Sequence, residues 1–140
     1  FKKLREKLDI PICGTEVIAG NNYSVANCIK DGIVDIVRTD VSWRAGITAV
    51  MKTAHLAESF GVKCELHTTI YHGLEQVQLH PSLAISNCEF FETLYPFDDF
   101  NFGTKSQLNI VDGYVMAPEG EGLCIDYDWD FIDKHTVAIL

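Results

Sequence analysis

Short apolar runs along the chain alternate with longer segments in which apolar residues recur every three or four positions. The short runs, rich in β-branched residues, predict strands over residues 10–13, 33–37, 62–66 and 88–91. The longer segments predict helices over residues 22–30, 47–60 and 73–84, the last interrupted by Pro81. This alternation is typical of parallel βα units. We therefore predict an α/β fold built on a parallel sheet.

The texture of the sequence changes after Glu92, where the alternation of strands and helices stops. We expect three features there, in chain order: an aromatic and polar loop over 96–105, a β-hairpin with an Asp-Gly turn over 108–117, and a short helix over 128–134. At the other end of the chain, residues 1–8 have the pattern of the last turns of a helix.

Composition and charge narrow the class of protein. The 140 residues are 47% hydrophobic and 22% charged, which is too apolar for a disordered chain. No apolar run approaches the length of about 18 residues that a membrane span needs. The net charge of −9 makes a surface that repels nucleic-acid phosphates and anionic lipids. The five cysteines include no Cys-x-x-Cys pair, so we expect reduced thiols, a cytoplasmic location, and neither nucleic acid nor membrane as a partner.

Each predicted strand ends at a side chain that can carry a charge or a proton. These residues are Glu16, Asp40, His67 and Glu92, separated by roughly the length of one strand–helix unit. Because the carboxyl ends of parallel strands meet at one edge, we expect the four side chains to lie together. An Asp beside a His can orient the imidazole for proton transfer, and carboxylates can bind Mg²⁺. For any single one, the alternative is a helix N-cap or a solvated loop residue.

Several short motifs follow one another in a consistent order. They are Ile10-Pro-Ile-Cys-Gly-Thr-Glu16, Asp35-Ile-Val-Arg-Thr-Asp40, Gly46-Ile-Thr48, Cys64-Glu-Leu-His67, Asn87-Cys-Glu-Phe-Phe-Glu92 and Asp112-Gly-Tyr-Val-Met-Ala-Pro118. In this order and spacing the sequence resembles the C-terminal part of the enolase superfamily, in its mandelate racemase and muconate lactonizing enzyme branch. The resemblance implies the C-terminal half of a TIM-like (β/α)7β barrel, strands five to eight, over residues 1–106. Residues 107–140 would then pack toward a capping domain.

The same resemblance implies roles for the strand-end residues. Glu16 matches a Mg²⁺ ligand, Asp40 and His67 match an Asp–His catalytic dyad, and Glu92 matches an acid that meets the substrate. The motifs after Asp40 and His67 favour an acid-sugar (aldonate or aldarate) dehydratase, which is a lyase. Such an enzyme removes the proton α to a carboxylate through a metal-stabilised enediolate and eliminates the β-hydroxyl as water. On the loops after these strands we expect substrate contacts from Trp43, Arg44, Thr68, Tyr71 and His72.

Other functions stay open at this point. One is a racemase or epimerase of a carboxylate substrate on the same scaffold, and another is a non-catalytic βα binding module. The sequence departs from the family at Ala45, where a glycine is common, and it lacks the family's upstream metal ligands and lysine base. A full barrel needs about 250 residues, and Phe1 stands where Met would begin a chain. We therefore expect part of a longer protein, inactive alone, whose partners are an acid sugar, further copies in a homo-oligomer and the missing N-terminal part.

Overall fold

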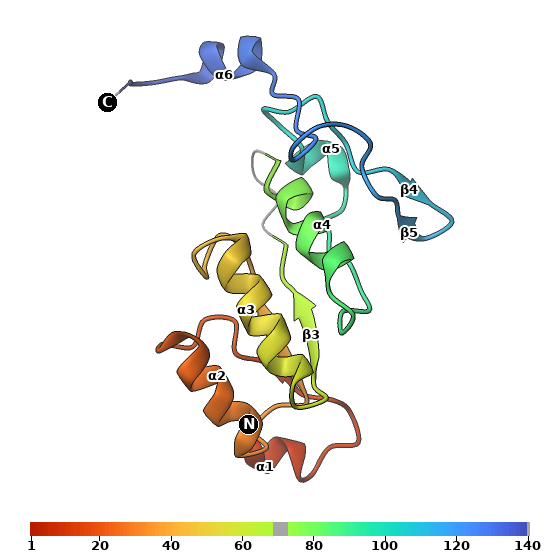
Figure 1. Ribbon diagram of the computed structural model, residues 1–140. Coiled ribbons are helices and arrows are strands. Elements are labelled where there is room, and N and C mark those ends of the chain that lie inside the picture. The colour runs from red at the N-terminus through yellow and green to blue at the C-terminus, as the bar shows by residue number, and fades with distance from the viewer. Residues whose placement is uncertain (69–72, 140) are drawn as a thin grey trace.

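The computed structural model describes residues 1–68 and 73–139 (Figure 1). The helices are α1 (Lys2–Arg5), α2 (Asn21–Lys30), α3 (Ile47–Glu58), α4 (Leu74–Ala84), α5 (Phe97–Phe100) and α6 (Trp129–His135). The strands are β1 (Cys13–Gly14), β2 (Ile36–Thr39), β3 (Lys63–Leu66), β4 (Ile110–Val111) and β5 (Tyr114–Val115). Within these two ranges, no helix is long and apolar enough to cross a membrane.

The first three strands form one parallel sheet in the order β1-β2-β3. The register pairs Gly14 with Val37 across the first two strands, and Thr39 with Leu66 across the second and third. The predicted parallel βα units are therefore confirmed for these three strands. Because all three run in one direction, their carboxyl ends share one edge, and the arrow of β3 in Figure 1 points toward the end of the molecule that holds α4.

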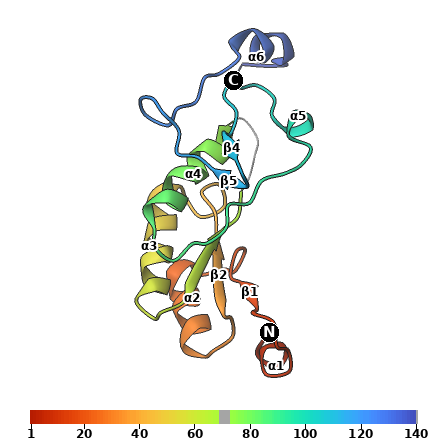
Figure 2. The same ribbon diagram turned by 90° about the vertical axis from the view of Figure 1, so that its right-hand side faces the viewer.

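The core lies between the sheet and helices α2 and α3, which Figure 2 shows on the same side of the strands. Val37 on β2 and Val50 and Ala54 on α3 have no exposed surface. Side chains alternate across a strand, so Val37 faces the helices while Arg38 points to the opposite side of the sheet. Burial of the helix-facing apolar groups away from water stabilises the layer. The other side of β2 is available for polar side chains.

The fourth predicted strand, over residues 88–91, is not a strand in the structure. Only Phe91 pairs with β3, through an isolated parallel bridge to Leu66. The physical reason is the Glu65 side chain, whose carboxylate accepts hydrogen bonds from two main-chain amides of this segment. In a regular strand, every second amide would instead donate to the backbone of the neighbouring strand. The predicted parallel direction of pairing with β3 is confirmed, but the pairing involves one residue and not a whole strand.

Two predictions about helices were also wrong. Residues 96–105, predicted as a loop, contain the single turn α5, in which the Asn101 amide donates to the Phe97 carbonyl over 2.9 Å. Helix α4 continues through Pro81 without interruption. Proline removes one backbone hydrogen bond, but the Pro81 ring is almost fully buried and its packing offsets that loss.

The segment after the bridge packs beside α4. Thr104 and Tyr127 form an antiparallel bridge, and strands β4 and β5 form the predicted hairpin. The predicted helix over 128–134 is confirmed as α6, at whose start the Asp128 side chain accepts from the Phe131 amide over 3.1 Å. These contacts hold the C-terminal segment together, and Ile125 of this segment lies close to Gly73 at the start of α4. Whether residues 107–140 form a separate unit that packs toward a capping domain stays a prediction.

Two glycines with positive φ provide a matched test of this packing. Gly73 precedes α4 with φ 79°, and a Cβ there would lie 2.9 Å from Cγ2 of Ile125; Gly61 has φ 68° and nothing within 4 Å. We expect Gly61→Ala to lower the free energy of unfolding by about 1–2 kcal/mol, the cost of a Cβ in the left-handed region. Gly73→Ala should cost about 1–3 kcal/mol more because of overpacking. Urea denaturation of both variants measures the difference, and equal losses would contradict the close approach of Ile125 to α4.

Candidate active site

The strand register brings the predicted site residues to one edge of the sheet. Glu16 follows β1, Asp40 follows β2 and His67 follows β3. The amide of His67 donates to the carbonyl of Thr39 over 2.9 Å. The main chain at His67 therefore lies beside the main chain that leads into Asp40. Glu92 comes directly after the bridge that stands in place of the fourth strand. Side-chain contacts, those of Arg38 included, connect all four residues.

Asp40 and His67 form a hydrogen-bonded pair. Nδ1 of His67 lies 2.7 Å from Oδ2 of Asp40, whose side chain has no exposed surface. Oδ1 accepts from the Trp43 amide at 2.6 Å, and the Ser42 hydroxyl lies 3.1 Å from both oxygens. A carboxylate only accepts hydrogen bonds, so this contact favours the proton of a neutral imidazole on Nδ1. Nε2 is then the ring nitrogen able to accept a proton from a bound molecule.

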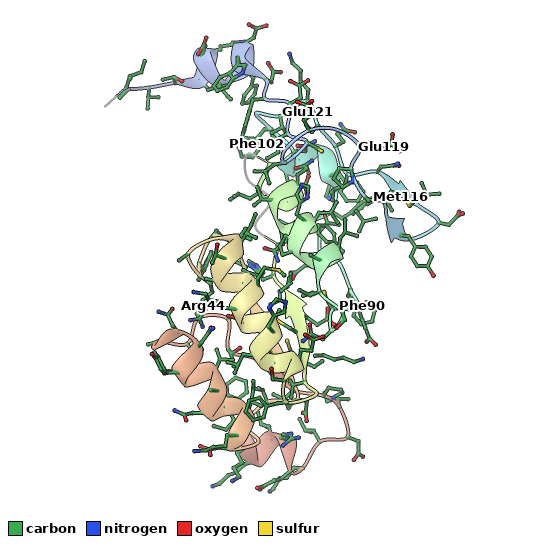
Figure 3. All side chains as sticks on the ribbon, in the orientation of Figure 1. Arg44, Phe90, Phe102, Met116, Glu119 and Glu121 are labelled. Atoms are coloured by element: carbon green, nitrogen blue, oxygen red, sulfur yellow. The ribbon has the colours of Figure 1, made fainter. Side chains whose placement is uncertain are left out.

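The loop between β2 and α3 carries two of the expected substrate contacts. The Trp43 ring meets the His67 ring edge-on, with centroids 6.4 Å apart, and is 61% exposed, so a bound molecule can reach it. Arg44, labelled in Figure 3, instead holds main chain: its Nε donates to the Glu16 carbonyl over 2.9 Å and its Nη2 donates to the Thr15 carbonyl. Their contacts with substrate stay predictions.

The other three expected substrate contacts follow β3. Thr68 is 4% exposed, and its hydroxyl has no hydrogen-bond partner in the part of the chain that the structure describes. Tyr71 and His72 lie outside the described residues. Thr68 is therefore placed directly after His67 but buried, and its contact with substrate also stays a prediction.

Glu16 reaches the Asp40–His67 pair because the backbone turns at Thr15. Thr15 has φ 86°, a left-handed conformation that costs about 1–2 kcal/mol for a residue with a Cβ. Its hydroxyl offsets this cost, donating to the Arg38 carbonyl over 3.1 Å and accepting from the Arg38 amide over 3.2 Å. The turn brings Oε1 of Glu16 to 3.2 Å from Nδ1 of His67.

Glu16, Asp40 and His67 offer ligand atoms that all lie within 4.8 Å of one another. Mg²⁺ takes oxygen ligands in octahedral geometry, so an imidazole nitrogen suits it poorly. The oxygens of Asp40 are buried among hydrogen-bond donors, whereas the Glu16 side chain is 25% exposed. Glu16 is therefore the residue whose chemistry fits Mg²⁺, and a complete octahedral shell requires oxygens from beyond these three side chains.

Arg38 is a site residue that the sequence reasoning missed. Its Nε donates to Oε2 of Glu16 over 3.1 Å, and its Nη2 donates to Glu92. Burial lowers the pKa of Arg38, but the carboxylates of Glu92 and Glu16 outweigh burial and raise that pKa above its ordinary value. The missed signal is spacing: Arg38 stands two residues before Asp40, and such residues share one side of a strand.

Glu65 is a second missed residue, and it fixes the approach of Glu92. Its Oε1 accepts from the Glu89 amide and its Oε2 from the Phe90 amide, each over 3.1 Å. The Phe90 side chain itself is 72% exposed and lies beyond β3 from α3 in the view of Figure 3. Glu65 therefore holds the backbone that leads to Glu92 by its amides rather than by apolar packing.

The fold and this site define a parallel α/β domain with acid–base side chains at its carboxyl edge. Residues 1–131 match the enolase C-terminal domain-like family. The chain therefore belongs to the enolase superfamily, in its mandelate racemase and muconate lactonizing enzyme branch, and the resemblance seen in the motifs is confirmed.

Three proteins similar to this chain show which members of the family it resembles. Arabinonate dehydratase of Saccharolobus solfataricus is 29% identical over 122 residues, which cover 86% of this chain and 32% of that protein. D-galactarolactone cycloisomerase of Agrobacterium fabrum is 27% identical over 98% of this chain and 38% of that protein. The structure of D-glucarate dehydratase from Agrobacterium tumefaciens, complexed with magnesium, matches with TM-score 0.81 and 40% identity over 95% of this chain and 35% of that chain. The chain thus spans about a third of the length of the relatives it matches.

The contacts of Glu65 give a prediction that needs no assay of activity. Hydrogen bonds to a charged group contribute about 1.5–3 kcal/mol, so Glu65→Ala should speed hydrogen exchange at the amides of Glu89 and Phe90 by about tenfold or more. Exchange is measured by NMR or mass spectrometry. Glu58→Ala is the matched control, because Glu58 accepts a hydrogen bond from the Ser86 hydroxyl and none from these amides. Unchanged protection in Glu65→Ala would show that the carboxylate does not hold this segment.

Proposed function

We propose that the complete protein containing this chain is a Mg²⁺-dependent acid-sugar dehydratase. The observation that carries the proposal is the His67–Asp40 pair beside Glu16 at the carboxyl edge of a parallel sheet. The relatives support the substrate class, since two of the three are named as dehydratases of sugar acids. In this proposal, strands from the rest of the protein extend the sheet into a closed barrel. The complete protein acts as a homo-oligomer in the cytoplasm.

His67 moves the proton in this proposal. With its Nδ1 proton directed to Asp40, Nε2 faces the substrate and removes the proton α to the carboxylate. The imidazolium that results is stabilised by the buried Asp40 anion. It returns the proton to the β-hydroxyl as that group leaves, so the substrate loses one hydrogen and one hydroxyl as water. The enol product then tautomerises to a 2-keto-3-deoxy acid.

Glu16 and Glu92 act on the substrate oxygens. Glu16 would hold Mg²⁺ together with ligands from the rest of the protein, and the bound ion would supply positive charge to the substrate carboxylate. Glu92, held at the same edge by Arg38, would meet the substrate there, where its carboxylate can accept a hydrogen bond from a substrate hydroxyl. Trp43 and Arg44 border this space and are the proposed contacts for the sugar chain.

A second candidate is a racemase, epimerase or cycloisomerase on the same scaffold. The observation that favours it is the similarity to D-galactarolactone cycloisomerase over 98% of this chain. It needs the same proton transfer by His67 but returns the proton to carbon or closes a ring. A non-catalytic binding module is the third reading, and it requires none of these proton transfers.

His67→Asn tests the proposed role of the imidazole. The complete protein, supplied with Mg²⁺, is screened on a panel of aldonates and aldarates for formation of a 2-keto-3-deoxy acid. Because Asn cannot exchange a proton, we expect the variant to lose activity by about 10²–10⁴-fold. Mg²⁺ affinity, measured separately by calorimetry, should be retained. His55→Asn is the matched control, since His55 is exposed on α3, and it should keep full activity.

The outcomes separate the three functions. Full dehydration by His67→Asn would contradict the role of His67. A stereoisomer or cyclic product in place of a keto acid would favour the second candidate. Absence of any Mg²⁺-dependent turnover by the complete protein across the panel would favour the binding module.

A further inference from the structure

Arg38 is a cation shared by two carboxylates of the candidate site. Its Nε lies 3.1 Å from Oε2 of Glu16, and its Nη2 donates to Oε2 of Glu92. The Arg38 side chain is 26% exposed, and those of Glu16 and Glu92 are 25% and 38% exposed. Partial burial reduces competition from water, so these contacts are stronger than ion pairs on an open surface. The three groups together carry one more negative charge than positive.

The main chain of Arg38 cannot move away from this position without breaking the sheet. Arg38 lies on the central strand β2, opposite Glu65 on β3. Both its amide and its carbonyl bond the Thr15 hydroxyl. Any movement of the guanidinium must therefore come from the Arg38 side chain, which can leave one carboxylate while it keeps the other.

The guanidinium occupies an oxygen that a divalent cation at Glu16 would use. Oε2 of Glu16 accepts from Arg38, and Oε1 faces His67, so an arriving ion finds both oxygens engaged. Arginine keeps its charge at every ordinary pH, so this competition does not disappear by deprotonation.

We propose that Arg38 is a positioning residue that sets the strength of Mg²⁺ binding. It competes with the ion for Glu16 and, once displaced, stays paired with Glu92. The inference rests on the metal role proposed above for Glu16. It assigns to one side chain both the orientation of Glu92 and the affinity of the metal site.

Substitution of Arg38 tests the competition. Arg38→Met removes the charge and the hydrogen bonds but keeps a long side chain. The Kd for Mg²⁺ should fall by about tenfold, because repulsion between a guanidinium and a divalent ion is removed and Oε2 of Glu16 is released. Arg38→Lys keeps the charge on one ammonium, which lacks the planar fork that spans both carboxylates. The Kd of Arg38→Lys for Mg²⁺ should lie between that of the unsubstituted protein and that of Arg38→Met.

The measurement is calorimetric titration of the complete protein with Mg²⁺ alone, without substrate, with folding checked by circular dichroism. Arg5→Met is the matched control: Arg5 pairs with Asp35 at 2.5 Å, just before β2 and away from the carboxyl edge. This variant undergoes the same change of charge and should leave the Kd unchanged. If folded Arg38→Met binds Mg²⁺ with an unchanged or higher Kd, the inference is overturned.

Glu92→Gln provides a second arm that leaves Arg38 in place. Without the anion at Glu92, the guanidinium is released to Glu16 alone, and Mg²⁺ should bind several-fold more weakly. The weakening should be smaller when Arg38 is already substituted, because only the direct charge effect of Glu92 remains. Equal effects in both backgrounds overturn the inference. If Arg38→Met does not fold, Arg38→Lys is the second background and the same comparison decides.

Glu16→Gln distinguishes failure of this inference from failure of the proposed function. If Glu16→Gln leaves the Kd for Mg²⁺ unchanged, or if neither the unsubstituted protein nor Arg38→Met binds Mg²⁺, the proposed metal site fails and the inference fails with it. Binding that depends on Glu16 but is indifferent to Arg38 overturns the inference alone.

Discussion

The Asp40 carboxylate has no exposed surface, and a buried anion is stable only when hydrogen-bond donors replace the water it has lost. Its donors come from two directions: the imidazole of His67 across the sheet, and the amide of Trp43 with the hydroxyl of Ser42 on the following loop. The same requirement therefore fixes the ring of His67 and the path of the chain toward α3. Removing either set would leave this buried charge with fewer donors beneath the site.

A second group of contacts depends on that arrangement. The left-handed turn at Thr15 aims Glu16 toward His67, and Arg38 ties Glu16 to Glu92. The cost of the turn is offset by hydrogen bonds from the Thr15 side chain to the main chain of β2. Three strands and the bridged segment thus meet through charged side chains at one edge, while apolar packing holds the opposite face of the sheet. This division explains how a stable layer can carry a strongly polar site.

Periodicity predicted much of the fold because hydrophobic spacing reflects which side of an element is buried. It predicted the three parallel strands and the residues that follow them. It did not predict the loss of the fourth strand. The hydrogen bonds that the Glu65 carboxylate accepts from main-chain amides do not depend on the spacing of apolar residues. Arg38 was not predicted for a related reason. A charged residue inside a strand is expected to face solvent, and only the structure shows that two carboxylates lie beside it. The roles of the four strand-end residues in catalysis and metal binding stay predictions, since they depend on atoms that this chain does not supply.

The central claim is that Asp40 holds His67 with Nδ1 protonated and Nε2 directed to the substrate. NMR of the complete protein labelled with ¹⁵N-histidine measures this directly, with the His67 signals assigned by their absence in His67→Asn. The account predicts that the neutral form of the ring carries its proton on Nδ1 and has a bare Nε2. A neutral ring protonated on Nε2, with Nδ1 as the acceptor, would contradict it.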